Sequence, residues 1–274
     1  AGKGIGFVDM PIMREKITDW PLVPGSAVKG VMRDYFAQKN IEEKKMESVF
    51  GKEKSDDSSN AGSLVLTDAH IVCLPVRSLY GTFAYITSQL VLERLKRDLE
   101  AAGYQDLPKE TPFPKNEQAF HARQSLLVSG AQIFFEDLDF KAVNDACTEE
   151  WAHILADILF PRDDTWKNIF VQRFAILSND CFTFMAKTGT EVAAHIRIED
   201  ETKIVSKGGL WYEESLPAEA ILAGLAWCDQ VYGNNGLTKE QILSEFCPEA
   251  GINLQIGGKT TVGKGRVKCL FTEG

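Results

Sequence analysis

The residues of this 274-residue chain best suited to hold a ligand lie in one glycine-rich segment close to its C-terminal end. Glycines permit positive φ angles and a close approach of the backbone to a ligand. Consecutive N–H groups in such a loop form a concave anion site, and basic side chains add positive charge to it. The pattern therefore favours contact with phosphate through Gly257, Gly258, Lys259, Thr260, Thr261, Gly263, Lys264 and Arg266.

Two other interpretations of this segment exist. Gly258 to Lys264 fits the G-x-x-x-x-G-K part of a Walker A nucleotide-binding loop. The segment departs from that motif because Gly265 stands where Ser or Thr must reach Mg²⁺, and too few residues follow to complete a nucleotide-binding domain. The simpler alternative is a glycine-rich turn between two final strands, but the basic charge favours phosphate contact.

A second candidate anion site lies at the start of a predicted helix. Ser26, which follows Pro24 and Gly25, is predicted as the N-cap, so the first N–H groups and the positive end of the helix dipole face out of the loop. Lys29 and Arg33 are four residues apart and share one helix face. A capped helix with solvated cations explains this segment equally well by itself. Together with the C-terminal loop, it favours a ligand with several phosphates, meaning RNA or DNA.

Asp9 is the leading candidate for acid–base or metal chemistry. It lies near Arg14 in an irregular segment with Gly and Pro, where a carboxylate can bind Mg²⁺ or transfer a proton. Arg14 itself is a candidate RNA contact, as is Gly25 farther along. The alternative is a turn-capping role, which is the usual one for Asp in loops. Farther along, Arg77 and Ser78 end a predicted strand just before Tyr80. They suit phosphate contact beside a stacked base, or equally a packed corner of a sheet.

Helices and strands alternate without a strict βαβ rhythm, so an α+β fold with an antiparallel sheet is predicted. Hydrophobic periodicity and capping residues locate the elements, and residues 103–124 are predicted as a loop-rich insertion. Two strands separated by Glu199–Thr202 predict a hairpin within Phe182–Gly209. The predicted helices are Ala27–Asn40, Ile41–Phe50, Ile86–Ala102, Glu149–Phe160, Pro217–Gln230 and Thr238–Glu245, and the predicted strands are Ser63–Leu74, Ala131–Glu136, Ile169–Leu177, Glu191–Ile198 and Lys203–Val205.

Composition limits the class of protein. The net charge of −9 argues against a free-standing nucleic-acid binder, although local basic patches remain possible. Six widely spaced cysteines and four histidines show no metal-ligand spacing, which predicts reduced thiols in a cytoplasmic protein and structural or surface histidines. Because no run of 18 apolar residues occurs, no membrane-spanning helix and no membrane partner are expected.

Five ordered segments resemble one known family. Together they span almost the whole chain: Asp9–Glu15, Pro24–Arg33, Pro75–Phe83, Gly209–Glu214 and Gln255–Gly265. The chain resembles the repeated backbone subunits of type III-B CRISPR (Cmr) effector complexes, which are members of the RAMP superfamily. The resemblance implies a single RAMP domain over residues 1–274, with a ferredoxin-like (RRM-like) palm, helical insertions and a β-hairpin thumb at about 182–209.

The resemblance also implies a function. Such subunits stack into a helical filament with other Cmr subunits along a guide RNA (crRNA) and cleave the complementary target RNA at regular intervals. The family's catalytic Asp falls on Asp9, a less certain second acid on Glu213, and its guide-contacting Lys on Lys29. A divalent cation such as Mg²⁺ is the expected transient cofactor, with no ligand set assigned. The alternative is a non-catalytic filament subunit that only binds guide RNA.

Two departures from the family pattern concern the partners of Asp9. The family has a first palm strand and a His-containing loop ahead of this Asp, whereas no His precedes His70 here. The family's Tyr near the second acid is replaced by Ser215. The acid–base partner of Asp9 is therefore left open by the sequence.

Overall fold

The computed structural model describes residues 8–52, 61–199, 205–233 and 236–273. The chain divides into two compact units, one formed by residues 1–22 and 70–223 and the other by residues 23–69 and 224–274. Each unit is thus assembled from segments that are distant in the sequence. The single RAMP domain expected over residues 1–274 stays a prediction.

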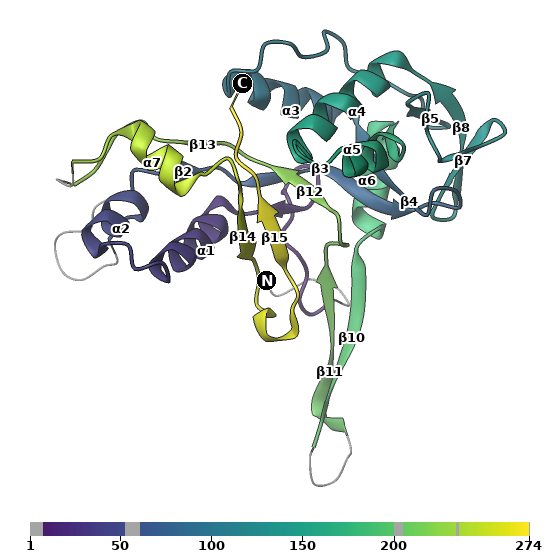
Figure 1. Cartoon of the computed structure of the whole chain (residues 1–274). Coiled ribbons are helices and arrows are strands. Elements are labelled where there is room, and N and C mark those ends of the chain that lie inside the picture. The colour runs from purple at the N-terminus through teal and green to yellow at the C-terminus, as the bar shows by residue number, and fades with distance from the viewer. Residues whose placement is uncertain (1–7, 53–60, 200–204, 234–235, 274) are drawn as a thin grey trace. The chain divides into compact units, whose positions relative to one another are not determined.

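A mixed sheet forms the centre of the first unit (Figure 1). The β4–β9 and β5–β8 pairs are parallel, whereas β3–β4, β5–β9, β6–β7, β7–β8 and β3–β12 are antiparallel. The predicted antiparallel sheet is therefore wrong in part, and a mixed α/β fold is observed. The strands follow the order β1 (Leu22–Val23), β3 (Ala69–Arg77), β4 (Phe83–Ser88), β9 (Phe174–Leu177), β5 (Gln118–His121), β8 (Leu138–Asn144), β7 (Gln132–Phe135) and β6 (Val128–Ser129), with β12 (Ile221–Ala223) beside β3.

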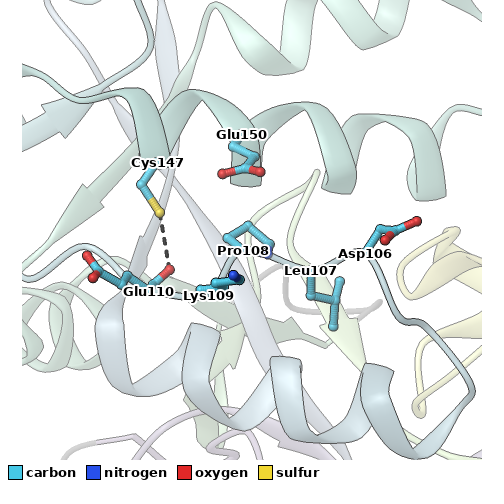
Figure 2. A pocket seen from close by; sticks show the side chains of 7 residues that line it. All are labelled: Asp106, Leu107, Pro108, Lys109, Glu110, Cys147 and Glu150. Atoms are coloured by element: carbon cyan, nitrogen blue, oxygen red, sulfur yellow. Dashed lines mark hydrogen bonds between the residues drawn. The ribbon is translucent and has the colours of Figure 1, made fainter.

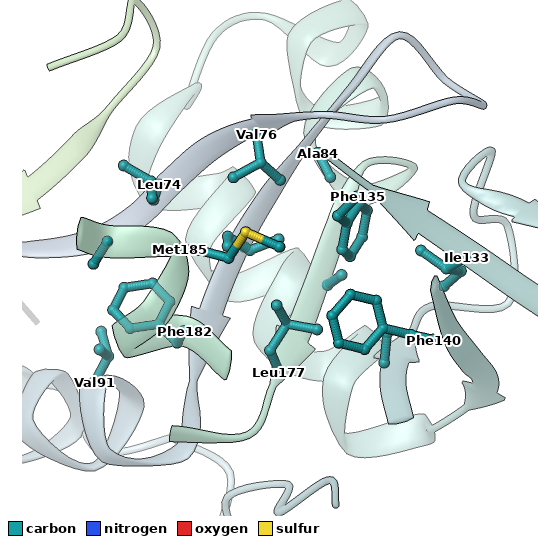
Figure 3. Packing of buried hydrophobic residues seen from close by; sticks show 14 of the residues in the cluster. Leu74, Val76, Ala84, Val91, Ile133, Phe135, Phe140, Leu177, Phe182 and Met185 are labelled. Carbon is teal, nitrogen blue, oxygen red and sulfur yellow. The ribbon is translucent and has the colours of Figure 1, made fainter. Parts of the chain in front are cut away.

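Both faces of this sheet are buried. Alternate residues of β9 belong to different hydrophobic clusters, Ala175 and Leu177 to one and Phe174 and Ile176 to the other. Phe182 of helix α6 (Asn179–Thr188) packs in the first cluster (Figure 3). The second cluster contains side chains of α3 (Gln89–Ala101), α4 (Ala146–Leu159) and α5 (Asp164–Val171). Burial on both faces explains the near-continuous apolar runs of the central strands.

Several predicted elements differ from the structure. The predicted helix Ile86–Ala102 starts in strand β4, and α3 begins only at Gln89. The predicted strand Ser63–Leu74 is divided into β2 (Val65–Leu66) and β3. The loop predicted over 103–124 contains β5, which lies between β9 and β8 in the middle of the sheet. The predicted strand Ile169–Leu177 begins inside helix α5 and is a strand only from Phe174. The predicted helix Pro217–Gln230 is instead β12 and β13 (Ala226–Trp227). A Cβ on Gly224, between these two strands, would lie 2.8 Å from the Asp68 carbonyl oxygen, so close strand pairing overrides the local helical pattern.

The second unit has its own aromatic core. Phe36, Phe50 and Phe246 meet with ring centroids 4.7–6.2 Å apart. These rings come from α1 (Gly25–Ala37), α2 (Glu43–Phe50) and α7 (Lys239–Phe246). The unit also contains the antiparallel pairs β2 (Val65–Leu66) with β13, and β14 (Ile252–Gln255) with β15 (Arg266–Cys269). None of the helices in the described part of the chain is long and apolar enough to cross a membrane.

A separate two-stranded hairpin extends from the first unit (Figure 1). Its strands are β10 (Glu191–Ile198) and β11 (Val205–Ser215), which confirms a hairpin in the predicted region. Two boundaries differ, because residues 182–188 continue helix α6 and β11 extends beyond residue 209. Phe182 and Met185 are anchored in the core, which keeps the start of the predicted excursion helical. The predicted connection Glu199–Thr202 lies mostly outside the described residues.

Candidate functional site

Asp9 lies beside strand β11 at the base of the hairpin. The N–H groups of Asp9 and Met10 both donate to the Tyr212 carbonyl at 3.1 Å, and the Glu214 N–H donates to the Met10 carbonyl at 3.0 Å. The Tyr212 N–H in turn donates to Asp9 Oδ2 at 2.8 Å. The segment thus continues the hairpin as a short parallel bridge between Met10 and Glu213. The Asp9 side chain is exposed, and the bond from the Tyr212 N–H fixes its orientation.

Glu213, the second predicted acid, is a residue of β11, the strand to which Asp9 is hydrogen-bonded. Its side chain is buried and accepts a hydrogen bond from Trp211 Nε1 at 2.5 Å. His195 lies across on β10, with Nε2 3.3 Å from Glu213 Oε2 and its ring stacked on Trp211 at 5.6 Å between centroids. Nε2 is buried and makes no hydrogen bond to any described residue, so the two side chains are close neighbours without a hydrogen bond between them. The stacking of His195 on Trp211 agrees with the predicted structural role of this histidine, whereas its closeness to Glu213 was not predicted.

Glu214 has a different environment from its neighbour. Its side chain is 8% exposed and pairs with Arg14 Nη2 at 2.5 Å. Glu214 also accepts bonds from Thr190 Oγ1 at 2.7 Å and from the Ile12 N–H at 3.1 Å. Arg14 Nη1 donates to the carbonyls of Asp19 and Ala186. These contacts give Arg14 a structural role inside the protein, and its predicted contact with RNA stays a prediction.

The carboxylates near Asp9 meet only part of what a metal ion requires. In the described residues, no three His, Cys, Asp or Glu side chains gather in a group that could hold a metal. Mg²⁺ commonly binds proteins through one or two carboxylates and completes its shell with water and substrate phosphates. Asp9 suits that limited role, whereas a preformed site made of protein ligands alone does not fit this part of the chain.

Helix α1 presents the second group of predicted residues, all within the second unit. The helix begins at Gly25 rather than after Ser26, with Pro24 as its N-cap residue, so the prediction of Ser26 as N-cap is wrong. The Gly25 N–H donates to Asp68 Oδ1 at 2.8 Å, which occupies one of the N–H groups expected to face an anion. A Cβ on Gly25 would lie 2.4 Å from the Leu66 carbonyl oxygen, so only glycine fits there.

Lys29 and Arg33 follow on α1, and both side chains are half-buried. Lys29 Nζ donates to the Leu64 carbonyl at 2.7 Å. Partial burial lowers the pKa of Lys29 from its ordinary value. An ammonium group has three donors, so this bond leaves Lys29 able to meet a phosphate while it also fastens the helix to the segment before β2.

The C-terminal loop connects β14 to β15, as the simpler interpretation of the segment expected. Gly257, Gly263 and Gly265 have positive φ angles, and Thr260–Val262 form a single 3₁₀ turn (η1). The N–H groups of Val262, Gly263 and Lys264 donate to carbonyls of the same loop. Those three groups are therefore not directed at a ligand. The loop nonetheless exposes Gly258, Thr260, Thr261, Lys264 and Arg266, with Lys259 half-buried.

Arg77 and Ser78 lie at the end of β3 in the first unit. Arg77 is exposed, yet its guanidinium pairs with Glu136 at 2.5 Å, and this hydrogen-bonded carboxylate raises the pKa of Arg77. Ser78 Oγ donates to the Phe134 carbonyl at 3.2 Å. Both contacts favour the packed-corner alternative for this turn. An RNA phosphate would have to compete with Glu136 for Arg77.

An open groove of about 510 Å³ lies elsewhere in the first unit, between the segment 106–110 and helix α4 (Figure 2). Its charged lining is mainly acidic, with Asp106, Glu110 and Glu150 against Lys109. Cys147 Sγ donates to the Glu110 carbonyl, and burial raises the pKa of this thiol to about 11. The groove therefore suits neither a phosphate nor a reactive thiolate, and we do not assign it to the site.

Sequence reasoning missed Glu214 and His195 as members of the site. The doublet Glu213–Glu214 was visible, but alternation along a strand places the two side chains on opposite faces, and only one matches the family acid. The alternation of side chains along a strand was the only sequence signal that Glu213 and Glu214 have separate roles. Nothing local indicated that Arg14 or His195 would be the partners.

Two Cmr4 proteins are similar to this chain over all or nearly all of its length. A protein of Pyrococcus furiosus named "CRISPR system Cmr endoribonuclease Cmr4" is 34% identical over 279 residues, covering 100% of this chain and 91% of the relative. The "CRISPR system CMR subunit Cmr4" of Saccharolobus solfataricus is 20% identical and covers 95% of this chain and 88% of the relative.

Solved structures give the same result. The crystal structure of oligomeric Cmr4 from Pyrococcus furiosus superposes with a TM-score of 0.74 at 28% identity, covering 98% of this chain and 93% of that one. A subunit in the type III-B Cmr-beta structure bound to cognate target RNA shares the fold, with a TM-score of 0.71 at 17% identity over 98% and 90% of the two chains. The resemblance to Cmr subunits is thereby confirmed. Because the RAMP superfamily model matches residues 4–268, this chain belongs to the RAMP superfamily.

Proposed function

We propose that this chain is the backbone subunit of an RNA-guided effector complex, in which it binds guide RNA and cleaves complementary target RNA. The observation that carries the proposal is Asp9, an exposed carboxylate fixed on β11 at the base of the hairpin. It occupies the motif position of the family's catalytic Asp. The full-length likeness to a protein named a Cmr endoribonuclease supports the same activity.

Sequence recognition in this proposal is delegated to pairing between guide and target, while the protein contacts the RNA backbone. Lys29, Arg33 and the exposed basic loop around Lys264 supply those contacts in the second unit. In the first unit, the hairpin serves as the thumb. Ile196 and Leu210, paired across its strands, are 54% and 53% exposed, which suits an apolar wedge against bases.

The proposed reaction is an internal transfer within the target strand. The ribose 2′-oxygen attacks the adjacent phosphorus, a bond from O2′ to phosphorus forms, and the bond from phosphorus to O5′ breaks. The 2′-hydroxyl loses a proton and the departing 5′-oxygen gains one, so the products are a 2′,3′-cyclic phosphate and a 5′-hydroxyl. Asp9 orients the reacting groups, and a bound Mg²⁺ would supply charge stabilisation of the phosphate.

The first prediction concerns Asp9→Asn in the assembled complex with guide RNA. Asn keeps the size of the side chain and an acceptor oxygen for the Tyr212 N–H, but it removes the negative charge. We expect target cleavage to fall by about 100-fold or more, with guide and target affinities unchanged. Cleavage is measured on complementary RNA, and the product ends are identified as cyclic phosphate or 5′-phosphate.

Asp19→Asn is the matched control, because Asp19 is a second exposed Asp of the same segment. Its carboxylate pairs only with Lys187 at 3.4 Å among the ion pairs of the described residues, so cleavage should persist. If Asp9→Asn cuts at the wild-type rate, Asp9 is not the catalyst. Products with 5′-phosphate ends would show attack by water instead of the 2′-oxygen.

A second candidate function is a non-catalytic filament subunit that binds guide RNA. It is favoured by the lack of a three-ligand metal group in the described residues. The same complex incubated with and without a chelator distinguishes the candidates. Loss of cleavage on chelation with guide binding intact supports the metal-dependent enzyme, and absence of cleavage under all conditions supports the structural subunit.

A further inference from the structure

We infer that Glu214 is a positioning residue for Asp9, acting through its buried pair with Arg14. The inference rests on the proposed function of Asp9 and adds to it a residue outside the family's assigned acids. Glu213 and Glu214 would then have separate tasks, since alternation along β11 points them to opposite faces of the strand.

The contacts of Glu214 join three parts of the first unit that are distant in sequence. One oxygen, Oε1, meets Arg14 and Thr190, and the other, Oε2, accepts the Ile12 N–H. Arg14 continues the network to the carbonyls of Asp19 and of Ala186 at the end of α6. Both carboxylate oxygens of Glu214 therefore contact the segment that contains Asp9, Oε1 through Arg14 and Oε2 through Ile12.

These contacts bear directly on where Asp9 lies. Upstream of Ile12, the segment touches β11 through four hydrogen bonds that involve Asp9, Met10, Tyr212 and the Glu214 backbone. Short exposed pairings of this kind fray easily by themselves. Just downstream, the Glu214 side chain accepts the Ile12 N–H. The residues before and after the Met10–Glu213 bridge are therefore both bonded to β11.

Breaking the Glu214–Arg14 pair should change the position of the Asp9 segment as well as the stability of the fold. Glu214 is 8% exposed on its side chain and Arg14 is 16% exposed. Removing one partner of such a pair leaves a largely buried charge uncompensated. The segment can relieve this by moving away from β11, and a displacement of about 1 Å at a catalytic group can cost about 100-fold in rate.

The test uses the guide-loaded complex with Glu214→Gln and Glu214→Ala. Gln keeps an acceptor for the Ile12 N–H and removes the charge that Arg14 requires. We expect the single-turnover cleavage rate at saturating target to fall roughly 10- to 100-fold, more for Ala than for Gln, with the target Kd unchanged. Hydrogen exchange of the same complexes should show faster exchange at the amides of Asp9, Met10 and Ile12, but not in β4 or β9.

Two further variants separate positioning from general destabilisation. Arg14→Lys keeps the positive charge and should retain more activity than Arg14→Met. Glu191→Gln is the matched control, because Glu191 is an exposed carboxylate of the same hairpin; its cleavage rate and amide exchange should equal those of the wild type.

The inference fails if the Glu214 variants cut at the wild-type rate, or if protection is lost equally in β4, β9 and the Asp9 segment. It also fails if Arg14→Lys is no better than Arg14→Met. Asp9→Asn is measured alongside. An inactive Asp9→Asn with fully active Glu214 variants overturns only this inference, whereas an active Asp9→Asn overturns the proposed function itself.

Discussion

Three carboxylates at the base of the hairpin illustrate how environment assigns roles to identical chemistry. Asp9 is exposed and oriented by one backbone N–H, Glu213 is buried beside Trp211 and His195, and Glu214 is paired with Arg14. An exposed carboxylate can meet a substrate, whereas a buried and paired one cannot without breaking its pair. This difference in exposure and pairing is why we propose that Asp9 contacts the reacting atoms and that Glu214 positions Asp9.

Lys29 gives a residue-scale prediction about guide binding. We expect Lys29→Ala to weaken binding equally for guides of different sequence and to lower the slope of log K against log salt by about one, since a phosphate contact releases counterions without reading bases. The variant also leaves the Leu64 carbonyl without this donor, so thermal unfolding is recorded in parallel with salt-dependent binding.

Lys44→Ala is the control for Lys29, because it removes an exposed positive charge from α2 in the same unit. A smaller loss of affinity for this variant isolates the local contact from the effect of net charge. Dependence of the Lys29→Ala loss on guide sequence would indicate base recognition and contradict the assignment.

At the scale of elements, the hairpin and the C-terminal loop are built on different principles. The hairpin has long strands, and one of its faces carries exposed apolar side chains such as Ile196, Leu210 and Tyr212. The C-terminal loop has short strands and depends on glycine conformations. An apolar face suits contact with bases or protein, whereas a basic, glycine-rich turn suits a phosphate backbone.

Gly265 supplies the element-scale prediction. Its φ is +78°, and an added Cβ would lie 2.0 Å from the Ile256 carbonyl oxygen. We therefore expect Gly265→Ala to destabilise the loop by about 1–3 kcal/mol and to weaken guide binding by rearranging Lys264 and Arg266. Chemical denaturation and guide-binding titrations measure the two effects.

Gly258→Ala serves as the comparison, since nothing lies within 4 Å of a Cβ at that position. It should leave stability nearly unchanged. If Gly265→Ala binds guide as the wild type does, the shape of this loop is not important for binding.

At the scale of the whole molecule, an acidic chain can bind a polyanion because its charge is unevenly placed. The net charge is −9, yet residues 259–268 carry four basic residues and no acidic one, whereas residues 136–164 carry nine acidic residues. Cys147 and Glu150 of this second region line the acidic groove beside α4, together with residues 106–110. Such polarity suits the proposed filament subunit, in which one surface would meet RNA and others would meet protein.

Acid sensitivity of the fold provides the prediction at this scale. Burial alone would raise the pKa of Glu15, but hydrogen bonds from Arg94, Thr18 and His70 outweigh it and hold the pKa below the ordinary 4.5. A depressed folded pKa contributes stability that is complete above the unfolded pKa and is lost as pH falls through the folded value. We expect Glu15→Gln to lower Tm at neutral pH and to reduce the fall of Tm below about pH 4.5.

The measurement is Tm against pH for the wild type and Glu15→Gln, with Glu191→Gln as the baseline for losing one exposed carboxylate. Parallel curves for the wild type and Glu15→Gln would contradict the role of Glu15. Because Arg94 Nη1 and Nη2 both contact Glu15, at 3.0 and 2.9 Å, Arg94→Met should reproduce the result of Glu15→Gln.

Local pattern predicted most helices of this chain and erred where distant strands compete for a segment. The helices near Ala27, Glu149 and Thr238 were found because apolar period and capping residues are local properties. The stretch after Pro217 has helical composition but pairs with β3 and β2. Strand β5 was hidden in a polar, proline-containing stretch, because its place between β9 and β8 depends on partners elsewhere in the chain.

The sequence by itself determined the family, the motif position of Asp9, the basic glycine-rich loop and the existence of the hairpin, since each resides in consecutive residues. Only the tertiary structure decided which residues surround Asp9. Met10 pairs with Glu213, and Arg14 with Glu214, across about two hundred residues of chain. No local spacing encodes such contacts, because they exist only after the sheet, helix α6 and the hairpin have brought these segments together.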